Sequence, residues 1–125
     1  MIFLTVDEII SLHSKLILKT GGIDGIRDKE LLESAVYSVY NSFDNIELYP
    51  TVKEKSARLA YSIVNNHAFL DGNKRIGILV MLMTLRLNDI LIEYTQQELI
   101  FLGLSIASSQ ASYDDVLMWL DIKIK

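Results

Sequence analysis

The sequence contains no cysteine, which excludes a disulfide framework and a zinc site built on thiolates. It has one proline, Pro50, and six glycines, and these residues do not gather into a linker or a low-complexity tract. The length of 125 residues suits one domain and leaves no room for two, so we expect a single domain over residues 1–125. Half of the residues are hydrophobic, which is enough to build a core at this size.

Long apolar runs and an excess of basic residues are also missing. The longest apolar run, from Ile76 to Leu85, is far short of the roughly 20 residues that cross a bilayer. Residues 1–8 have no basic leader, so we expect no signal peptide, no membrane partner and a cytoplasmic location. The net charge of −4 argues against direct binding of nucleic acid, which requires an excess of Lys and Arg to neutralise phosphates.

Capping signals indicate where helices begin, because a Thr or Ser followed three residues later by an acid can satisfy free backbone N–H groups. Four pairs have this spacing: Thr5 with Glu8, Thr51 with Glu54, Thr95 with Glu98 and, with a shorter acid, Ser112 with Asp115. Asp28 is a further N-cap before a run with helical spacing, and only residues 43–50 are typical of a short extended piece. The fold class is therefore all-α. The predicted helices cover residues 5–19, 28–42, 51–66, 74–88, 95–108 and 112–123.

The predicted helix over residues 74–88 is apolar almost all round, which is typical of a helix buried in the middle of a domain. Gly72 and Asn73 lie directly before it, where the first N–H groups have no internal partner and carry partial positive charge. Gly72 also permits close backbone approach and positive φ. This arrangement favours a phosphate site. Lys74 and Arg75 are unfavourable at a helix start by a few tenths to ~1 kcal/mol unless an anion binds there.

Two further side chains of this loop suit transfer chemistry. Asp71 is adjacent to the expected phosphate site and is a natural ligand for Mg²⁺, which takes one or two carboxylates plus phosphate oxygens. His67 can accept a proton from a hydroxyl near neutral pH. We expect Phe69 to point into the core and to anchor the loop. Together these groups are the components of phosphoryl or nucleotidyl transfer.

Each of these features alone is more often structural. A single His before a helix is usually an ordinary loop residue, Asp-Gly-Asn is usually a turn, and Lys-Arg is usually solvated surface. Their order within nine residues, directly before a buried helix, favours the functional interpretation. His13 has no such neighbours and is interpreted as a structural or surface residue.

Residues 67–75, His-Ala-Phe-Leu-Asp-Gly-Asn-Lys-Arg, resemble the Fic/Doc family signature H-x-F-x-(D/E)-G-N-x-R-x-x-R. Four other segments, 21–28, 31–35, 48–51 and 54–57, resemble the Doc (death-on-curing) branch. The resemblance implies a Fic-fold bundle of about six helices, with the motif loop ahead of a buried central helix. It also implies site roles by position: His67 as general base, Asp71 as Mg²⁺ ligand, Phe69 as loop anchor, and Gly72, Asn73, Lys74 and Arg75 as contacts to the nucleotide phosphates.

The chain departs from the family pattern at three positions. Lys74 replaces the glycine of most Fic proteins and is typical of the Doc branch, whose best-known members transfer the γ-phosphate of ATP to elongation factor Tu. The final arginine of the signature falls at Ile78, and Ala68 replaces a common proline. The first hypothesis is therefore a Doc-type kinase toxin that uses ATP and Mg²⁺ and blocks translation. The alternatives are a Fic-type adenylyltransferase and a non-catalytic binding module.

The self-inhibitory motif of many Fic proteins, (S/T)-x-x-x-E-(G/N), is missing, since no Glu is followed by Gly or Asn. The resemblance therefore implies control by a separate chain, a Phd-like antitoxin. Tyr37, Tyr40, Phe43 and Tyr49 are candidates for lining its groove, and core packing explains each of them equally well. The resemblance also implies that residues 43–50 are the family's flap, which holds the target peptide.

Overall fold

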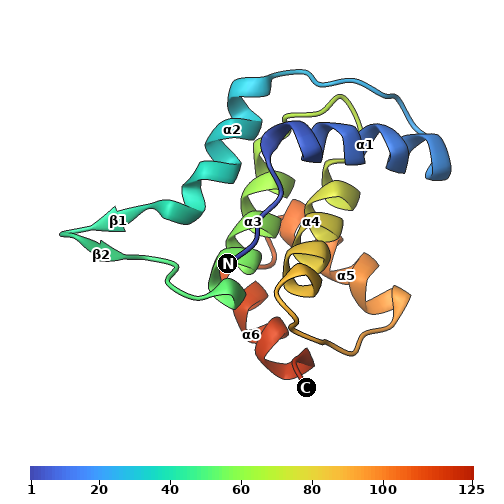
Figure 1. The fold of residues 1–125 in the computed structure, drawn as a ribbon. Coiled ribbons are helices and arrows are strands. Elements are labelled where there is room, and N and C mark those ends of the chain that lie inside the picture. The colour runs from blue at the N-terminus through green and yellow to red at the C-terminus, as the bar shows by residue number, and fades with distance from the viewer.

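The computed structural model describes residues 1–125 and contains six α-helices, one 3₁₀ turn and a short β-hairpin (Figure 1). The elements in chain order are α1 (Val6–Thr20), α2 (Lys29–Tyr37), the turn η1 (Ser38–Tyr40), β1 (Ser42–Phe43), β2 (Ile46–Glu47), α3 (Val52–Asn66), α4 (Asn73–Leu87), α5 (Gln96–Ala107) and α6 (Tyr113–Lys123). The predicted all-α fold class is confirmed. No helix combines the length and the apolar character needed to cross a membrane.

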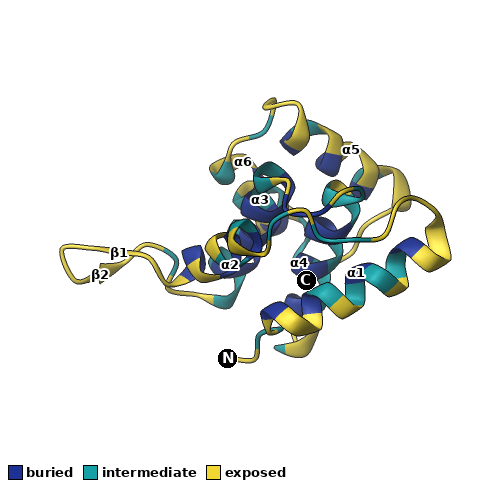
Figure 2. Cartoon of the chain, turned by 90° about the horizontal axis from the view of Figure 1, so that it is seen from above, coloured by how far each residue is buried: buried dark blue, intermediate teal, exposed yellow.

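Helices α3 and α4 form the centre of the molecule and share its most extensive contact. One cluster of buried side chains joins α3 and α4 to α1 and α2, and a second joins them to α5 and α6. Figure 2 shows the buried residues gathered around these two helices and the hairpin exposed. The prediction of a buried central helix after the motif loop is therefore confirmed, and α1 crosses the end of the bundle where that loop lies (Figure 1).

The predicted helix starts are confirmed to within one residue. Full capping boxes form at Thr5, Thr95 and Ser112, and the Asp28 carboxylate accepts hydrogen bonds from the N–H groups of Glu30 and Leu31. At the start of α3 only half of the predicted box forms. There the Thr51 hydroxyl accepts from the Glu54 N–H and donates to the Glu54 carboxylate.

The predicted end of the second helix at residue 42 is wrong, because α2 ends at Tyr37. Ser38 donates its hydroxyl hydrogen to the Ala35 carbonyl (2.7 Å) and accepts from Arg58 Nε (3.1 Å). A serine that binds a nearby backbone carbonyl competes with regular helix geometry. The chain then tightens into η1 and leaves for the hairpin.

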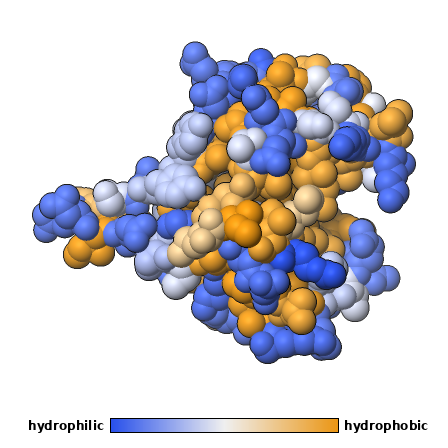
Figure 3. All heavy atoms as spheres, viewed as in Figure 1, coloured by the Kyte–Doolittle hydropathy of each residue, from blue (hydrophilic) through white to orange (hydrophobic).

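The extended piece expected near residues 43–50 is the hairpin, in which Phe43 lies opposite Ile46. Its two-residue turn, Asp44-Asn45, has positive φ at both positions (53° and 63°), as tight hairpins require. The hairpin projects from the body and carries hydrophilic and apolar atoms side by side (Figure 3). Its root is fixed by Lys55, which is 2% exposed and donates to the carbonyls of Val39 and Tyr49.

Gly77 lies where α4 packs closely against α3. A Cβ added there would lie 2.6 Å from Val64 Cγ2 and 3.3 Å from the Ala60 carbonyl oxygen. Val64 is fully buried and β-branched, so it has little freedom to move aside. The spacing of the two central helices therefore depends on this glycine.

We expect Gly77→Ala to lower the free energy of unfolding by about 1–3 kcal/mol, because it overpacks this contact. The matched control is Gly103→Ala in α5, where the nearest atoms to an added Cβ are 3.6 and 3.7 Å away. There alanine is favoured over glycine in a helix by roughly 0.5–1 kcal/mol, so stability should be unchanged or higher. Urea denaturation of the two variants tests this, and equal destabilisation would contradict it.

Candidate active site

The motif loop joins α3 to α4, and His67 is its first residue. His67 ends α3 in the left-handed conformation (φ 51°, ψ 45°), and its side chain is exposed. Its backbone carbonyl accepts two hydrogen bonds from the Arg27 guanidinium, one from Nε (3.0 Å) and one from Nη2 (2.5 Å). The backbone of His67 is therefore held while its imidazole faces solvent.

The segment before α2 pairs with the motif loop through the backbone. The Ala68 carbonyl accepts from the N–H groups of Arg27 (2.7 Å) and Asp28 (3.0 Å), and the Gly25 carbonyl accepts from the Leu70 N–H (3.1 Å). These bonds form an isolated antiparallel bridge. A loop without regular structure thus has its polar backbone satisfied by a segment about 40 residues earlier.

Phe69 is 2% exposed and lies in the core shared with α1 and α2, the buried position that was expected of it. Its backbone is held by Asn73, whose side-chain oxygen accepts from the Phe69 N–H and whose side-chain nitrogen donates to the Phe69 carbonyl, both at 3.0 Å. The Asn73 side chain therefore fastens the loop, and its backbone N–H is the group that is left for the predicted contact with phosphate.

The start of α4 is uncapped. Gly72 occupies the N-cap position at φ 77° and ψ 20°, and no side chain accepts from the first turn. The first backbone bond runs from the Ile76 N–H to the Gly72 carbonyl (2.9 Å), so the N–H groups of Asn73, Lys74 and Arg75 remain free of intrahelical partners. An uncapped start of a 15-residue helix attracts negative charge.

Asp71 presents an ionised carboxylate beside this helix start. Oδ2 accepts from the Ile23 N–H (3.1 Å) and Oδ1 from the Gly72 N–H (2.8 Å), and Arg75 Nη2 lies 3.6 Å from Oδ1. The hydrogen bond from Ile23 first, and then that from Gly72 and the charge of Arg75, lower the pKa of Asp71 below its ordinary value. The carboxylate is thus charged at neutral pH.

The Asp71 carboxylate fits a hard divalent cation, because the side chain is 42% exposed and each oxygen retains a lone pair. The chain has no group of three or more His, Asp or Glu side chains that could hold a metal by themselves. Phosphate oxygens and water would have to complete the coordination, as is usual for Mg²⁺.

The two cations of the motif occupy different surroundings. Arg75 Nη1 donates to the Thr20 hydroxyl (2.6 Å) and the Gly21 carbonyl (2.7 Å), so the end of α1 fixes its position. Lys74 is exposed at the rim of a cavity of about 420 Å³ between α1, α4 and α5. Ile78, where the family signature ends in arginine, lines the same cavity.

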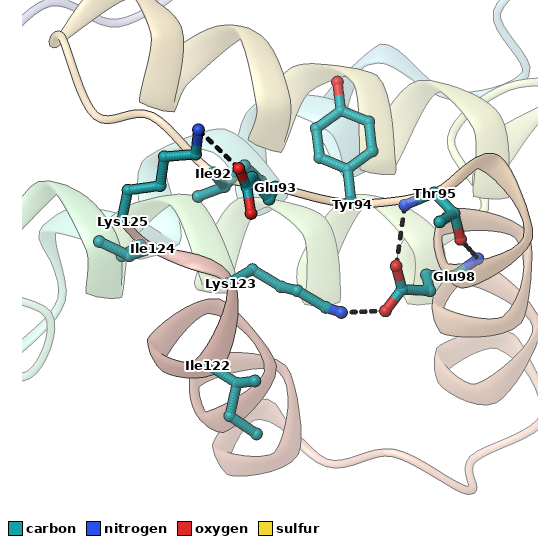
Figure 4. A pocket seen from close by; sticks show the side chains of 9 residues that line it. All are labelled: Ile92, Glu93, Tyr94, Thr95, Glu98, Ile122, Lys123, Ile124 and Lys125. Carbon is teal, nitrogen blue, oxygen red and sulfur yellow. Dashed lines mark hydrogen bonds and ion pairs between the residues drawn. The ribbon is translucent and has the colours of Figure 1, made fainter.

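A larger surface pocket lies elsewhere, at the C-terminal end of the chain. Figure 4 shows its nine lining residues, which belong to segments 92–98 and 122–125 and include none of the motif. Ion pairs join its two walls, Lys123 with Glu98 and Lys125 with Glu93. The smaller cavity, next to Lys74 and Arg75, is the one adjacent to the motif.

The contribution of His13 was missed from the sequence. Its side chain is 1% exposed and lies under the motif loop, with Nε2 2.7 Å from the Asp71 carbonyl oxygen. The burial of His13 could have been predicted from the sequence, since His13 shares a helix face with the buried Ile9 and Ile17, each four residues away. The contact with Asp71 spans 58 residues and had no local signal.

The chain belongs to the Fic/DOC family, whose profile matches residues 3–85. A segment of 55 residues is 40% identical to a protein described as Toxin Doc from Mycolicibacterium smegmatis (strain ATCC 700084 / mc(2)155). This similarity covers 44% of the chain and 42% of that protein, less than half of either. The family predicted from the motif is confirmed, and the similarity agrees with the Doc branch.

Gly22 offers a test of the Asp71 geometry. It has φ +122°, and a Cβ there would lie 2.5 Å from Asp71 Oδ2. We expect Gly22→Ala to displace the carboxylate from the Ile23 N–H and so to raise the pKa of Asp71 toward its ordinary value. Titration of the Asp71 carboxyl carbon by NMR measures this directly.

The control is Gly21→Ala, which adds a side chain at φ +89° with no atom within 4 Å of the new Cβ. Both variants carry backbone strain of roughly 1–2 kcal/mol, but only Gly22→Ala touches Asp71. Equal pKa values for Asp71 in the two variants would contradict the role assigned to the Ile23 hydrogen bond.

Proposed function

We propose that this protein is a Doc-type toxin that transfers the γ-phosphate of ATP to a Ser or Thr hydroxyl of a target protein. One observation carries the proposal. The motif loop combines an exposed imidazole, His67, with an ionised carboxylate, Asp71, that is bonded to the Gly72 N–H at the uncapped start of α4. Family membership and the similarity to a protein described as Toxin Doc support the same interpretation.

Phosphate binding is assigned to the start of α4. The free N–H groups of Asn73, Lys74 and Arg75 stabilise phosphate oxygens, and they need no reorganisation because Asn73 and Phe69 fix the loop. Asp71 would hold a magnesium ion bound to ATP, and that ion would neutralise charge on the phosphates. Arg75, restrained by Thr20 and Gly21, adds positive charge at a fixed position.

His67 acts as the general base. Its imidazole takes the proton of the target hydroxyl, the hydroxyl oxygen bonds to the γ-phosphorus, and the bond from that phosphorus to ADP breaks. The imidazole is exposed, so a protein substrate can reach it. Arg27 holds the His67 backbone, which keeps the base in place during the approach.

Lys74 favours transfer of the γ-phosphate over transfer of AMP. It lies one turn before Ile78, and both face Gly103 of α5, from whose added Cβ they would be 3.7 and 3.6 Å away. The face of α4 that carries arginine in the family signature is therefore apolar at Ile78 and cationic at Lys74. Adenylyl transfer remains the second candidate, because the rest of the motif is shared with adenylyltransferases. A non-catalytic binding module would not need His67.

We further propose that a Phd-like antitoxin restrains the protein by docking a helix into the cavity beside Lys74. This cavity is mainly apolar, and Leu79, Ile100 and Leu104 are among the side chains that line it. Tyr37, Tyr40, Phe43 and Tyr49 do not line it. The first three are exposed near the hairpin, which suits the flap assigned to residues 43–50 better than the antitoxin groove.

A label-transfer assay tests the reaction. With elongation factor Tu, Mg²⁺ and ATP labelled at the α- or the γ-phosphate, we expect label from the γ-position only. His67→Ala should lower the rate by about 10²–10⁴-fold, the usual contribution of a general base. Label from the α-position would establish adenylyl transfer instead. If no label appears on this factor or in whole-cell extract, the enzyme proposal is wrong.

Binding of the nucleotide is tested without turnover. ATP with Mg²⁺ at 100 times its dissociation constant should stabilise the fold by ~2.7 kcal/mol in thermal melting. Asp71→Asn should remove the dependence of this shift on Mg²⁺ and retain a smaller shift with ATP alone. A shift in Asp71→Asn that still grows with Mg²⁺ would exclude Asp71 as the metal ligand.

A further inference from the structure

His13 lies in the middle of α1, 1% exposed, directly beneath the motif loop. Its Nε2 is 2.7 Å from the Asp71 carbonyl oxygen. A carbonyl oxygen only accepts hydrogen bonds, so Nε2 carries the hydrogen and donates it. A buried ring thus makes a side-chain bond to the backbone at the centre of the motif.

The ring itself is held from two directions. It stacks on the Phe69 ring, with centroids 3.9 Å apart and planes 16° from parallel. On its other nitrogen, Nδ1 lies 3.7 Å from Asp24 Oδ1, and this carboxylate oxygen also accepts from the Ser14 hydroxyl (3.0 Å). These contacts come from α1, the segment after it and the motif loop, so they fix the direction in which Nε2 donates.

The bond from His13 decides which way the Asp71–Gly72 peptide faces. In a planar trans peptide the carbonyl and the N–H point in opposite directions. With the carbonyl held toward α1, the Gly72 N–H points the other way and donates to Asp71 Oδ1 (2.8 Å). Gly72 has φ 77°, and glycine adopts positive and negative φ about equally readily, so the residue itself does not select this orientation.

The neighbouring backbone bonds do not make the selection either. The Leu70 N–H is bonded on one side of this peptide, and the Gly72 carbonyl begins α4 on the other. The peptide between them has its carbonyl bonded to His13 and its N–H bonded only to the adjacent Asp71 side chain. Without His13, a rotated peptide would turn the Gly72 N–H toward α1 and release the carboxylate.

We propose that His13 is a positioning residue that locks the Asp71–Gly72 peptide, so that Asp71 and the free N–H groups of α4 face the phosphate site together. The role of His13 in nucleotide binding rests on the proposed function, whereas its role in ordering the motif backbone does not. His13 touches neither nucleotide nor target, and it acts through the motif backbone.

The test compares His13→Gln with His13→Met. The Gln side-chain nitrogen is as many bonds from Cα as His Nε2 and can donate the same hydrogen bond, whereas Met fills similar space without a donor. We expect sharp single amide NMR signals for Gly72 and Asn73 in the wild-type protein and in His13→Gln. In His13→Met these signals should broaden or double, while the rest of the spectrum stays native.

Binding of ATP with Mg²⁺ is measured on the same samples by calorimetry. We expect His13→Met to weaken it by about tenfold or more, the usual effect of removing a group that orients a ligand, and His13→Gln to restore it. Ile106→Val is the control for general destabilisation, because Ile106 is buried in the other core cluster. It should lower stability and leave the Gly72 and Asn73 signals unchanged.

Unchanged signals for Gly72 and Asn73 in His13→Met, or the same broadening in Ile106→Val, would overturn the proposal. Since the signals are recorded without nucleotide, a wild-type protein that binds no ATP would count against the proposed function alone. If His13→Met does not fold, the proposal is tested on the imidazole hydrogens of His13 in the wild-type protein. A slowly exchanging Nε2 hydrogen supports the lock, and a ring without hydrogen on Nε2 excludes it.

Discussion

The pairing of residues 25–28 with the motif loop is the constraint on which the rest of the site depends. The loop has no regular structure, so its carbonyl and N–H groups must find partners outside it. Arg27, Asp28 and Gly25 provide those partners for His67, Ala68 and Leu70. Once these bonds form, the imidazole of His67 faces solvent and Phe69 enters the core, and the chain arrives at Gly72 in the direction that begins α4.

The core determines how rigid this arrangement is. Helices α3 and α4 contribute to both hydrophobic clusters, and the motif loop is the connection between these two helices. Gly77 lets them approach closely, so neither helix can shift without disturbing the other. The end of α1 adds a second restraint through Arg75, whose guanidinium it binds at Thr20 and Gly21. A site that works by position and charge requires such stiffness, because a small misplacement of its groups weakens both effects.

Much of the fold was predictable from the sequence because its signals are local. Capping residues mark five of the six helix starts to within one residue, and the order of residues in the motif predicted the family. The end of α2 had no comparable signal: Ser38, which follows the helix, bonds both to the nearby Ala35 carbonyl and to Arg58 of α3. Likewise, nothing in the sequence indicated that both side-chain amide atoms of Asn73 bond to the backbone of Phe69. The place of His13 beneath Asp71 is a product of helix packing, and no nearby sequence feature encodes it.

The bond between Arg27 and His67 has a consequence for the order of folding. It joins residues 40 positions apart, and the enclosed chain contains α2, the hairpin and α3. Closing a loop of that length lowers the conformational entropy of the chain before any contact offsets the loss. Contacts between distant residues therefore slow folding. The helices on either side can form early from local signals, but the motif loop acquires its shape only when Arg27 meets His67. The motif loop is therefore expected to take its shape late in folding.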